Sequence, residues 1–152
     1  IHEFMSAFSI RPVRAEPLIE VSKIYRSLEK PGAAYVFAKQ AVELPYPQND
    51  ILFISEDVYS YGALDEISAT AYYAGHILEG YNATKKLLED KLVPEAHVER
   101  VKKNFEQYQT VMQQVQAQQM QQNMNQQIEK MKEKKEQKAQ TTKYKKKKAT
   151  SR

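Results

Sequence analysis

The sequence predicts an all-α protein built from two helical hairpins, a third helix that covers them and a long polar C-terminal helix. Three observations predict this class. Apolar residues recur at steps of three and four, two segments 46 residues apart repeat one pattern of large and small side chains, and no Gly or Pro interrupts residues 95–152. Steps of three and four place apolar side chains on one face of a helix, which can then pack against a neighbour.

The first hairpin is expected over about residues 14–44. Pro31 can open its second helix, because the proline ring fixes a helical φ and the first turn needs no N–H. The first helix carries an apolar face and the second a face of small side chains: Leu18, Val21, Ser22 and Tyr25, then Ala34, Ala38 and Ala41. Small side chains let the two helices approach closely.

The second hairpin is expected over about residues 59–90. Asp57 is interpreted as the N-cap of its first helix, and Gly75 can end that helix in the left-handed conformation. His76 is interpreted as a turn residue. The pattern of the first hairpin returns 46 positions later: Leu64, Ile67, Ser68 and Ala71, then Gly80, Thr84 and Leu87.

Residues 45–57 form an insertion between the two hairpins. Pro45 and Pro47 stop the preceding helix. The run Ile51–Ile54 is too apolar for a solvated loop, so we expect it to tuck beneath the hairpins. An isolated strand there would leave backbone groups unpaired.

A capping helix is expected from about residue 95, because the last apolar face of a repeat array must be covered. Its stripe comprises Val98, Val101, Phe105, Tyr108, Met112 and Val115. Residues 1–108 are therefore interpreted as the helical domain and 109–138 as a Gln/Met-rich helical extension. The stripe weakens after Val115, which argues against a stable homodimeric coiled coil. The oligomeric state is left open. Residues 139–152 are expected to form a disordered basic tail.

Charge divides the chain into two parts. Residues 1–128 hold 12 Lys/Arg and 16 Asp/Glu, a net charge of −4, whereas residues 129–152 hold 11 and 3, a net charge of +8. A basic run of this kind can release counterions from nucleic acid or an acidic surface, or serve as a localisation signal or a solubilising tail. The candidates for polyanion contact are Lys143, Lys145, Lys146, Lys147 and Lys148.

Four segments carry a resemblance to a known family: RPVRAEPL from Arg11, AYVFAKQAVELPYPQNDILFISEDVY over residues 34–59, LDEIS from Leu64 and AYYAGH from Ala71. They resemble the tetratricopeptide-like helical region found downstream of the catalytic domain in family 2 glycosyltransferases. The resemblance covers about residues 9–108 and includes the insertion, which a generic 34-residue repeat lacks. It implies an α-α superhelix beside a sugar-transferring domain. Enzymes of that class hold their nucleotide-sugar through a metal on an Asp-x-Asp element, and this sequence contains no such triplet.

Catalytic, cofactor and metal sites are not expected in this chain. It has no cysteine, and the three histidines are far apart and lack the spacing of a zinc site on one helix. No run of eighteen apolar residues suggests a membrane span, and a cytoplasmic location is expected. Whether the whole protein is an enzyme is left open.

The function expected from the sequence is that of a scaffold, whose surface between the first helices of the two hairpins docks a peptide or an adjoining catalytic domain. The candidate partner-binding residues are Arg11, Arg14, Glu20, Lys23, Asp65 and Tyr72. Helix-entry capping with a local ion pair is an alternative role for Arg11 and Arg14. Two other functions are kept: part of an active glycosyltransferase that contacts the acceptor sugar, and a polyanion-binding protein acting through its tail.

Overall fold

The computed structural model describes the backbone of residues 1–149 and the side chains of residues 1–132, 134 and 135. The chain is all-helical over these residues, as the sequence predicted, and residues 1–149 contain no β-strand. It divides into two compact units, Ile1–Met112 and Gln113–Arg152, which are described separately.

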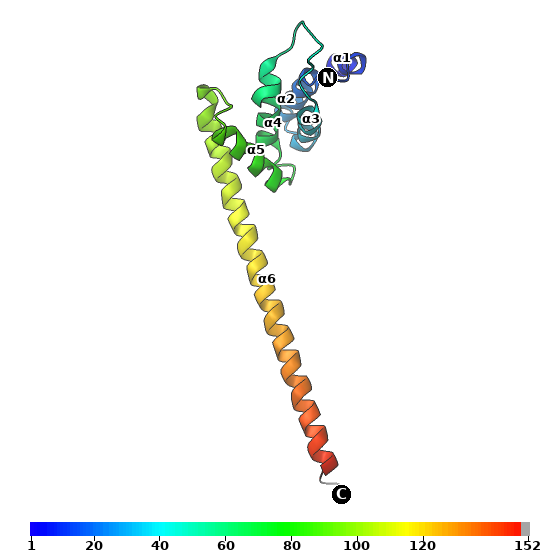
Figure 1. Ribbon diagram of the computed structural model, residues 1–152, viewed down its shortest axis with the longest axis vertical. Coiled ribbons are helices and arrows are strands. Elements are labelled where there is room, and N and C mark those ends of the chain that lie inside the picture. The colour runs from blue at the N-terminus through cyan, green and yellow to red at the C-terminus, as the bar shows by residue number, and fades with distance from the viewer. Residues whose placement is uncertain (150–152) are drawn as a thin grey trace. The chain divides into compact units, whose positions relative to one another are not determined.

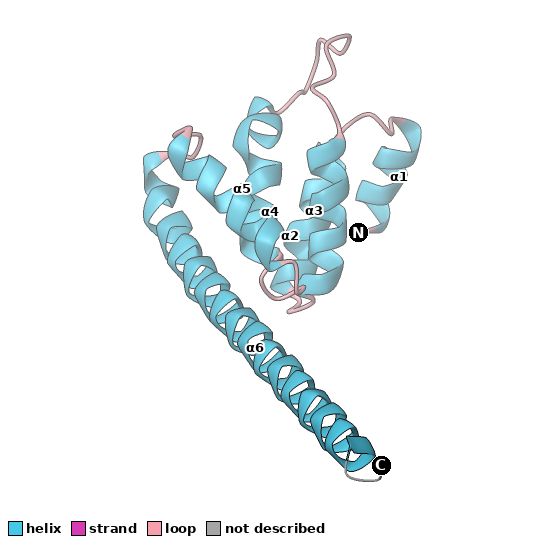
Figure 2. Cartoon of the chain, turned by 60° about the horizontal axis from the view of Figure 1, so that its bottom comes forward, coloured by secondary structure: helices cyan, strands magenta, loops and turns pink. Residues whose placement is uncertain are grey.

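The first unit consists of short helices that pack in chain order (Figures 1 and 2). They are α1 (His2–Ile10), α2 (Glu16–Ser27), α3 (Pro31–Glu43), a π-helical turn (Val58–Gly62), α4 (Ala63–Thr70), α5 (Ile77–Glu89) and the first part of α6 (Glu95–Ala149). Helix α2 packs on α3, α3 on α4, and α4 on α5. Short connections between consecutive helices give two hairpins, α2–α3 and α4–α5.

The helix ends follow the local chemistry of the sequence in most places. Pro31 is the first residue of α3, as predicted. Gly75 has the predicted left-handed conformation, with a φ of +82°, but α4 ends earlier, at Thr70, and a turn leads from there to Gly75. Asp57 occupies the N-cap position of the π-helical turn, as predicted, but its side chain makes no capping hydrogen bond. A side-chain N-cap needs extended backbone, whereas Asp57 has helical angles of −57° and −34° and continues into the π-helical turn.

The 46-residue repeat is visible in the burial of the two hairpins. Equivalent positions are buried in both hairpins: Val21 and Ile67, Ser22 and Ser68, Ala34 and Gly80, Ala38 and Thr84, Ala41 and Leu87. Leu18 and Leu64 differ, because Leu18 is completely buried and Leu64 only partly. Helix α1, which the sequence analysis did not predict, supplies Phe8 to the cluster around Leu18.

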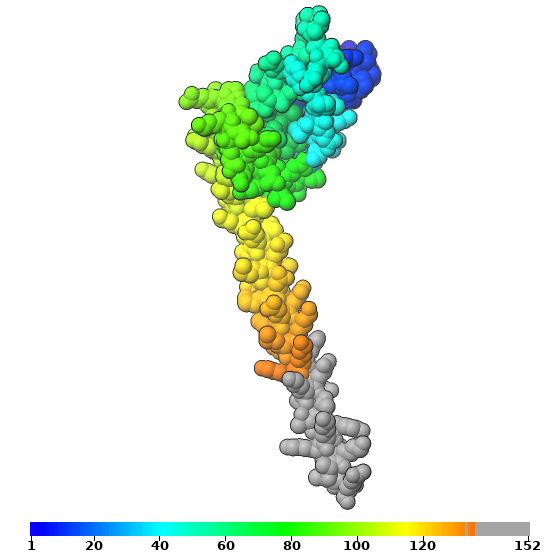
Figure 3. Space-filling model, in the orientation of Figure 1, coloured from blue at the N-terminus to red at the C-terminus, as the bar shows by residue number. Residues whose placement is uncertain are grey.

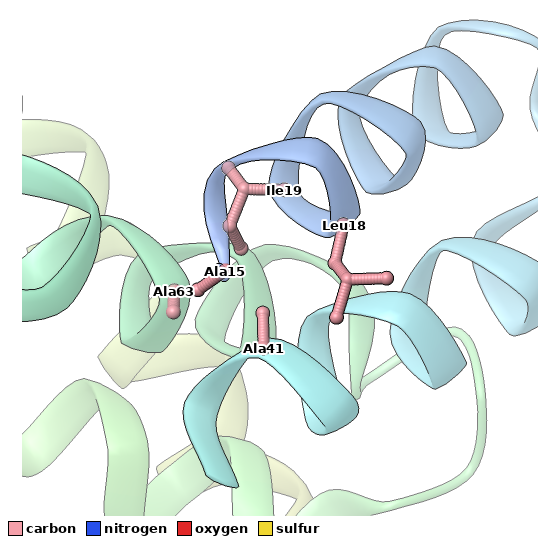
Figure 4. Close-up of a cluster of buried hydrophobic side chains, with 5 residues drawn as sticks. All are labelled: Ala15, Leu18, Ile19, Ala41 and Ala63. Atoms are coloured by element: carbon pink, nitrogen blue, oxygen red, sulfur yellow. The ribbon is translucent and has the colours of Figure 1, made fainter. Parts of the chain in front are cut away.

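A cluster of small and large apolar side chains joins α2, α3 and α4 (Figure 4). It contains Ala15, Leu18, Ile19, Ala41 and Ala63, which are 6% exposed or less. The three alanines keep the backbones close, while Leu18 and Ile19 fill the space between them. Burying one side chain of this size contributes about 1.5–3 kcal/mol, so this contact stabilises the first hairpin against α4.

Tyr108 fixes α6 to the second hairpin. Its hydroxyl donates a hydrogen bond to the Ser68 carbonyl oxygen at 3.0 Å and accepts one from the Tyr72 backbone N–H at 2.9 Å. Burial raises the pKa of Tyr108 to about 12, so the phenol stays protonated and can donate. A Cβ at Gly80 would lie 2.1 Å from the Tyr108 hydroxyl oxygen, so this contact requires glycine.

The insertion differs from the expectation. Ile51 and Phe53 are 91% and 92% exposed, so the prediction that this run tucks beneath the hairpins is wrong. The Arg14 guanidinium donates to the carbonyl oxygens of Leu52 and Phe53 at 3.5 and 2.5 Å and pairs with Asp50 at 3.3 Å. The backbone is therefore held against the helices while the apolar side chains face outward, and Figure 3 shows the segment near residue 50 projecting.

The second unit is the continuation of α6. Every described side chain from residue 113 onward is exposed, including Met120, Met124, Ile128 and Met131. The bounds of α6 extend to Ala149. Residues 139–149, where a disordered tail was expected, belong to this helix, so the expected disorder is not confirmed. The side chains of the five candidate lysines fall outside the described part of the chain.

Candidate partner-binding groove

A groove of about 820 Å³ crosses the first unit and is lined by α2, α4 and the first turns of α6. Helices α2 and α4 are the first helices of the two hairpins, and α6 follows the second hairpin directly. Helices α2 and α4 are in contact, so residues distant in sequence reach the same surface. The groove therefore takes side chains from three segments.

The Arg26 guanidinium on α2 is fixed by Glu66 on α4. Its Nε and Nη2 atoms donate to the two oxygens of Glu66 at 3.1 and 2.8 Å. The Glu66 side chain is 6% exposed, whereas that of Arg26 is 47% exposed. The hydrogen bond to Glu66 raises the pKa of Arg26, so this arginine is charged at every accessible pH.

A second pair of the same kind joins α6 to α4. Arg100 donates from Nη1 and Nη2 to the two oxygens of Asp65 at 3.2 and 2.7 Å. Asp65 is 15% exposed and Arg100 is 46% exposed. In both pairs the carboxylate is the more buried group and the guanidinium is the more exposed one. Bidentate pairs of this type hold an arginine in a defined orientation.

The remaining lining is a mixture of charged, small and aromatic side chains. Lys23 is half-exposed and pairs with Glu20 at 2.8 Å, one turn back on α2. Ala69 leaves room in the wall, and the exposed ring of Tyr73 stands at the groove. Asn104 donates to the Ser68 hydroxyl oxygen at 3.2 Å, so its amide is fixed by the core.

The candidate residues named from the sequence fall into three places. Lys23 and Asp65 line the groove, and Glu20 lies beside Lys23. Tyr72 packs edge-to-face against Tyr73 and Tyr108 at 5.2 and 5.9 Å between ring centroids. Arg11 and Arg14 instead bind the insertion through Asp50. Asp65 is also more buried than expected, since Arg100 covers it.

The cluster around Arg14 anchors the insertion. Arg14 donates to both oxygens of Glu16 at 3.0 and 2.7 Å, and Glu16 accepts hydrogen bonds from the Tyr59 hydroxyl at 2.8 Å and the Ser55 backbone N–H at 3.1 Å. Burial opposes ionisation of Glu16, but these hydrogen bonds outweigh it and lower its pKa to about 2. The ion pair expected from the local sequence is therefore present, and it also positions residues 50–55.

The two ion pairs that fix the groove, Arg26–Glu66 and Arg100–Asp65, were not predicted from the sequence. Arg26 and Glu66 are 40 positions apart, and Arg100 and Asp65 are 35 apart. No periodicity within one helix reports such pairs, since they depend on how the helices stack. A carboxylate on the buried face of α4 was the available signal, because Glu66 lies one helical turn from Ala63 and from Thr70, which are both buried.

Two features are absent from the part of the chain that the structure describes. No group of three or more potential metal-ligating residues occurs there. Likewise, none of the described helices is both long enough and apolar enough to cross a bilayer.

Comparisons of the chain with protein-family models, curated proteins and solved structures find no match. The groove is therefore interpreted from its own geometry and charge.

Proposed function

We propose that the chain is a non-catalytic, tetratricopeptide-like scaffold whose groove between α2, α4 and α6 binds a segment of a protein partner. The observation that carries this proposal is the bidentate pairing of Arg26 and Arg100, from opposite sides, to neighbouring carboxylates on α4. These pairs hold three helices in one arrangement and leave an open, polar surface between them. A preorganised surface of this kind binds with little loss of side-chain freedom.

The sequence resemblance supports an adjoining glycosyltransferase domain as one source of the partner segment. An Asp-x-Asp element, which in enzymes of that class holds the nucleotide-sugar through a metal, is absent from this sequence. In this proposal the chain contributes binding, and any sugar transfer takes place on another domain.

Contact with an acceptor sugar is a second candidate function, favoured by one observation. Tyr73 is 66% exposed at a groove that also carries charged side chains, and sugars pack on exposed aromatic rings. Peptide binding is the better supported of the two, because the groove spans three helices and its charged groups come from all of them.

The test is selection of binding peptides from a displayed library of extended dodecapeptides, using the full chain. Ala69→Trp places a large uncharged side chain in the groove, and Ala7→Trp, at an exposed position of α1, is the matched control. We expect enriched peptides that compete with one another, bind the Ala7 variant normally and lose binding to the Ala69 variant.

Two results would count against peptide docking. One is a library without enrichment, and the other is a set of peptides that bind the Ala69 variant as well as the unchanged protein. Binding of oligosaccharides that is lost in Tyr73→Ala, without any peptide enrichment, would support the sugar-contact function instead.

A further inference from the structure

We infer that the segment bound in the groove is acidic, with Asp or Glu carboxylates that accept hydrogen bonds from Lys23, Arg26 and Arg100. This inference rests on the proposed docking function and names the chemistry of the partner. It concerns only the first unit of the chain.

The first argument is the number of hydrogen-bond donors left over. A guanidinium has five N–H donors. Arg26 directs two of its donor atoms to Glu66, and Arg100 two of its own to Asp65. Among the residues with described side chains, neither arginine has another acceptor. Both side chains remain about half-exposed at the groove, so the unused N–H groups are available to a ligand.

The second argument is that the acidic side chains of the two ion pairs are more buried than the basic ones. The carboxylates of Asp65 and Glu66 are 15% and 6% exposed and face the arginines that cover them. A ligand therefore meets cationic groups first. The groove lining contains one exposed carboxylate, that of Glu29, but three half-exposed cations: Lys23, Arg26 and Arg100. Ligand carboxylates would form charge-assisted hydrogen bonds with these cations, which are stronger than neutral ones.

The third argument separates an acidic peptide from a nucleic acid. Residues 1–128 carry a net charge of −4, so a long polyphosphate crossing this surface would be repelled outside the groove. A short peptide whose few carboxylates lie in the groove is repelled less, because it does not extend across the acidic surface outside it. Its apolar parts also match Ala69 and the ring of Tyr73, which lie in the same lining.

The experiment is a two-dimensional NMR titration of the isotope-labelled full chain, which resolves the groove from the basic tail. The probes are the peptide acetyl-GADEADEAG-amide, its isosteric amide form acetyl-GANQANQAG-amide, and a decamer of single-stranded oligo(dT). We expect the acidic peptide to shift the side-chain Nε–Hε signals of Arg26 and Arg100 and the backbone signal of Ala69. The amide peptide and the oligonucleotide should leave these signals in place, whatever they do at residues 129–152.

A matched pair of charge reversals tests the role of the cations. Lys23 and Lys85 are 46% and 45% exposed, and each pairs with a glutamate on its own helix, but only Lys23 lines the groove. Lys23→Glu should weaken acidic-peptide binding at the groove signals by roughly tenfold at low salt, and Lys85→Glu by less than twofold. Each reversal changes an exposed side chain and should leave the fold intact.

The outcomes separate this inference from the docking function. Groove signals that respond equally to the acidic and amide peptides would overturn the acidic specificity while docking stands. Responses confined to residues 129–152, equal effects of the two lysine reversals, or an equal response of the groove to oligo(dT) would also overturn it. Docking itself is decided by the Ala69→Trp selection, because that substitution leaves the charge of the groove unchanged.

Discussion

Replacing Gly80 by alanine tests the packing of α6 against the second hairpin, because two physical effects predict opposite signs. Gly80 lies within α5, where alanine is the better helix former by about 1 kcal/mol. Helix propensity alone therefore predicts that Gly80→Ala stabilises the protein. The structure predicts the opposite, since the new Cβ would lie 2.1 Å from the Tyr108 hydroxyl oxygen and 2.2 Å from its Cζ atom.

The expected loss of stability follows from the interactions that Tyr108 loses when its ring moves. Moving the ring breaks the hydrogen bonds to the Ser68 carbonyl and from the Tyr72 N–H, each worth about 1 kcal/mol. Overpacking adds roughly 1–3 kcal/mol. After the gain of about 1 kcal/mol in helix propensity, we expect Gly80→Ala to lower the free energy of unfolding by about 2–4 kcal/mol.

The assay is urea unfolding followed by tyrosine fluorescence and circular dichroism. Gly32→Ala is the control, because nothing lies within 4 Å of a Cβ at Gly32; that change should be neutral or stabilising. In a Tyr108→Ala background, Gly80→Ala should become stabilising by up to about 1 kcal/mol. A stabilising effect of Gly80→Ala in the unchanged protein would refute the packing of Tyr108 against Gly80.

Three further outcomes are expected. The pKa of Glu16 is lowered to about 2, so its carboxylate stabilises the fold above pH 4.5 and loses that contribution as the pH falls from about 4.5 to 2. Glu16→Gln should therefore flatten the acid side of a stability–pH curve measured by urea unfolding. An unchanged acid limb would contradict this role. Arg26→Met should destabilise by about 1–3 kcal/mol by leaving Glu66 uncompensated, and adding Glu66→Met should recover most of the loss in the same assay; equal losses in both variants would argue against the pair. Phe53→Ser should change the melting temperature little, as expected for a 92% exposed side chain, and a large decrease would show that the ring packs.

The parts of the fold that follow local rules could be predicted from the sequence. The 46-residue shift identified buried positions in both hairpins, such as Val21 and Ile67, because side-chain size and spacing determine helix packing. The insertion could not be predicted in this way. Its apolar run suggested burial, but Arg14 binds the backbone carbonyls of Leu52 and Phe53, and that contact joins segments 38 and 39 positions apart.

The groove could be predicted only in outline. Lys23 and Asp65 were named because they lie on the first helices of the hairpins, where a stacked array exposes one face. The pairs that fix the groove were missed, since Arg100 reaches Asp65 from α6 and a sequence pattern carries no information on that distance. The burial of the Asp65 and Glu66 carboxylates beneath the arginines likewise depends on how the helices pack. That burial determines whether a ligand contacts arginine or carboxylate.

A spin label on the acidic peptide gives the most direct test of the proposed binding of an acidic segment in the groove. With the nitroxide at one end of acetyl-GADEADEAG-amide, we expect the strongest signal broadening at Lys23, Ala69 and Arg100, which line the groove from α2, α4 and α6. Val36 and Lys85, exposed on α3 and α5, should keep sharp signals. Broadening centred on residues 51–53, or confined to residues 129–152, would contradict the account.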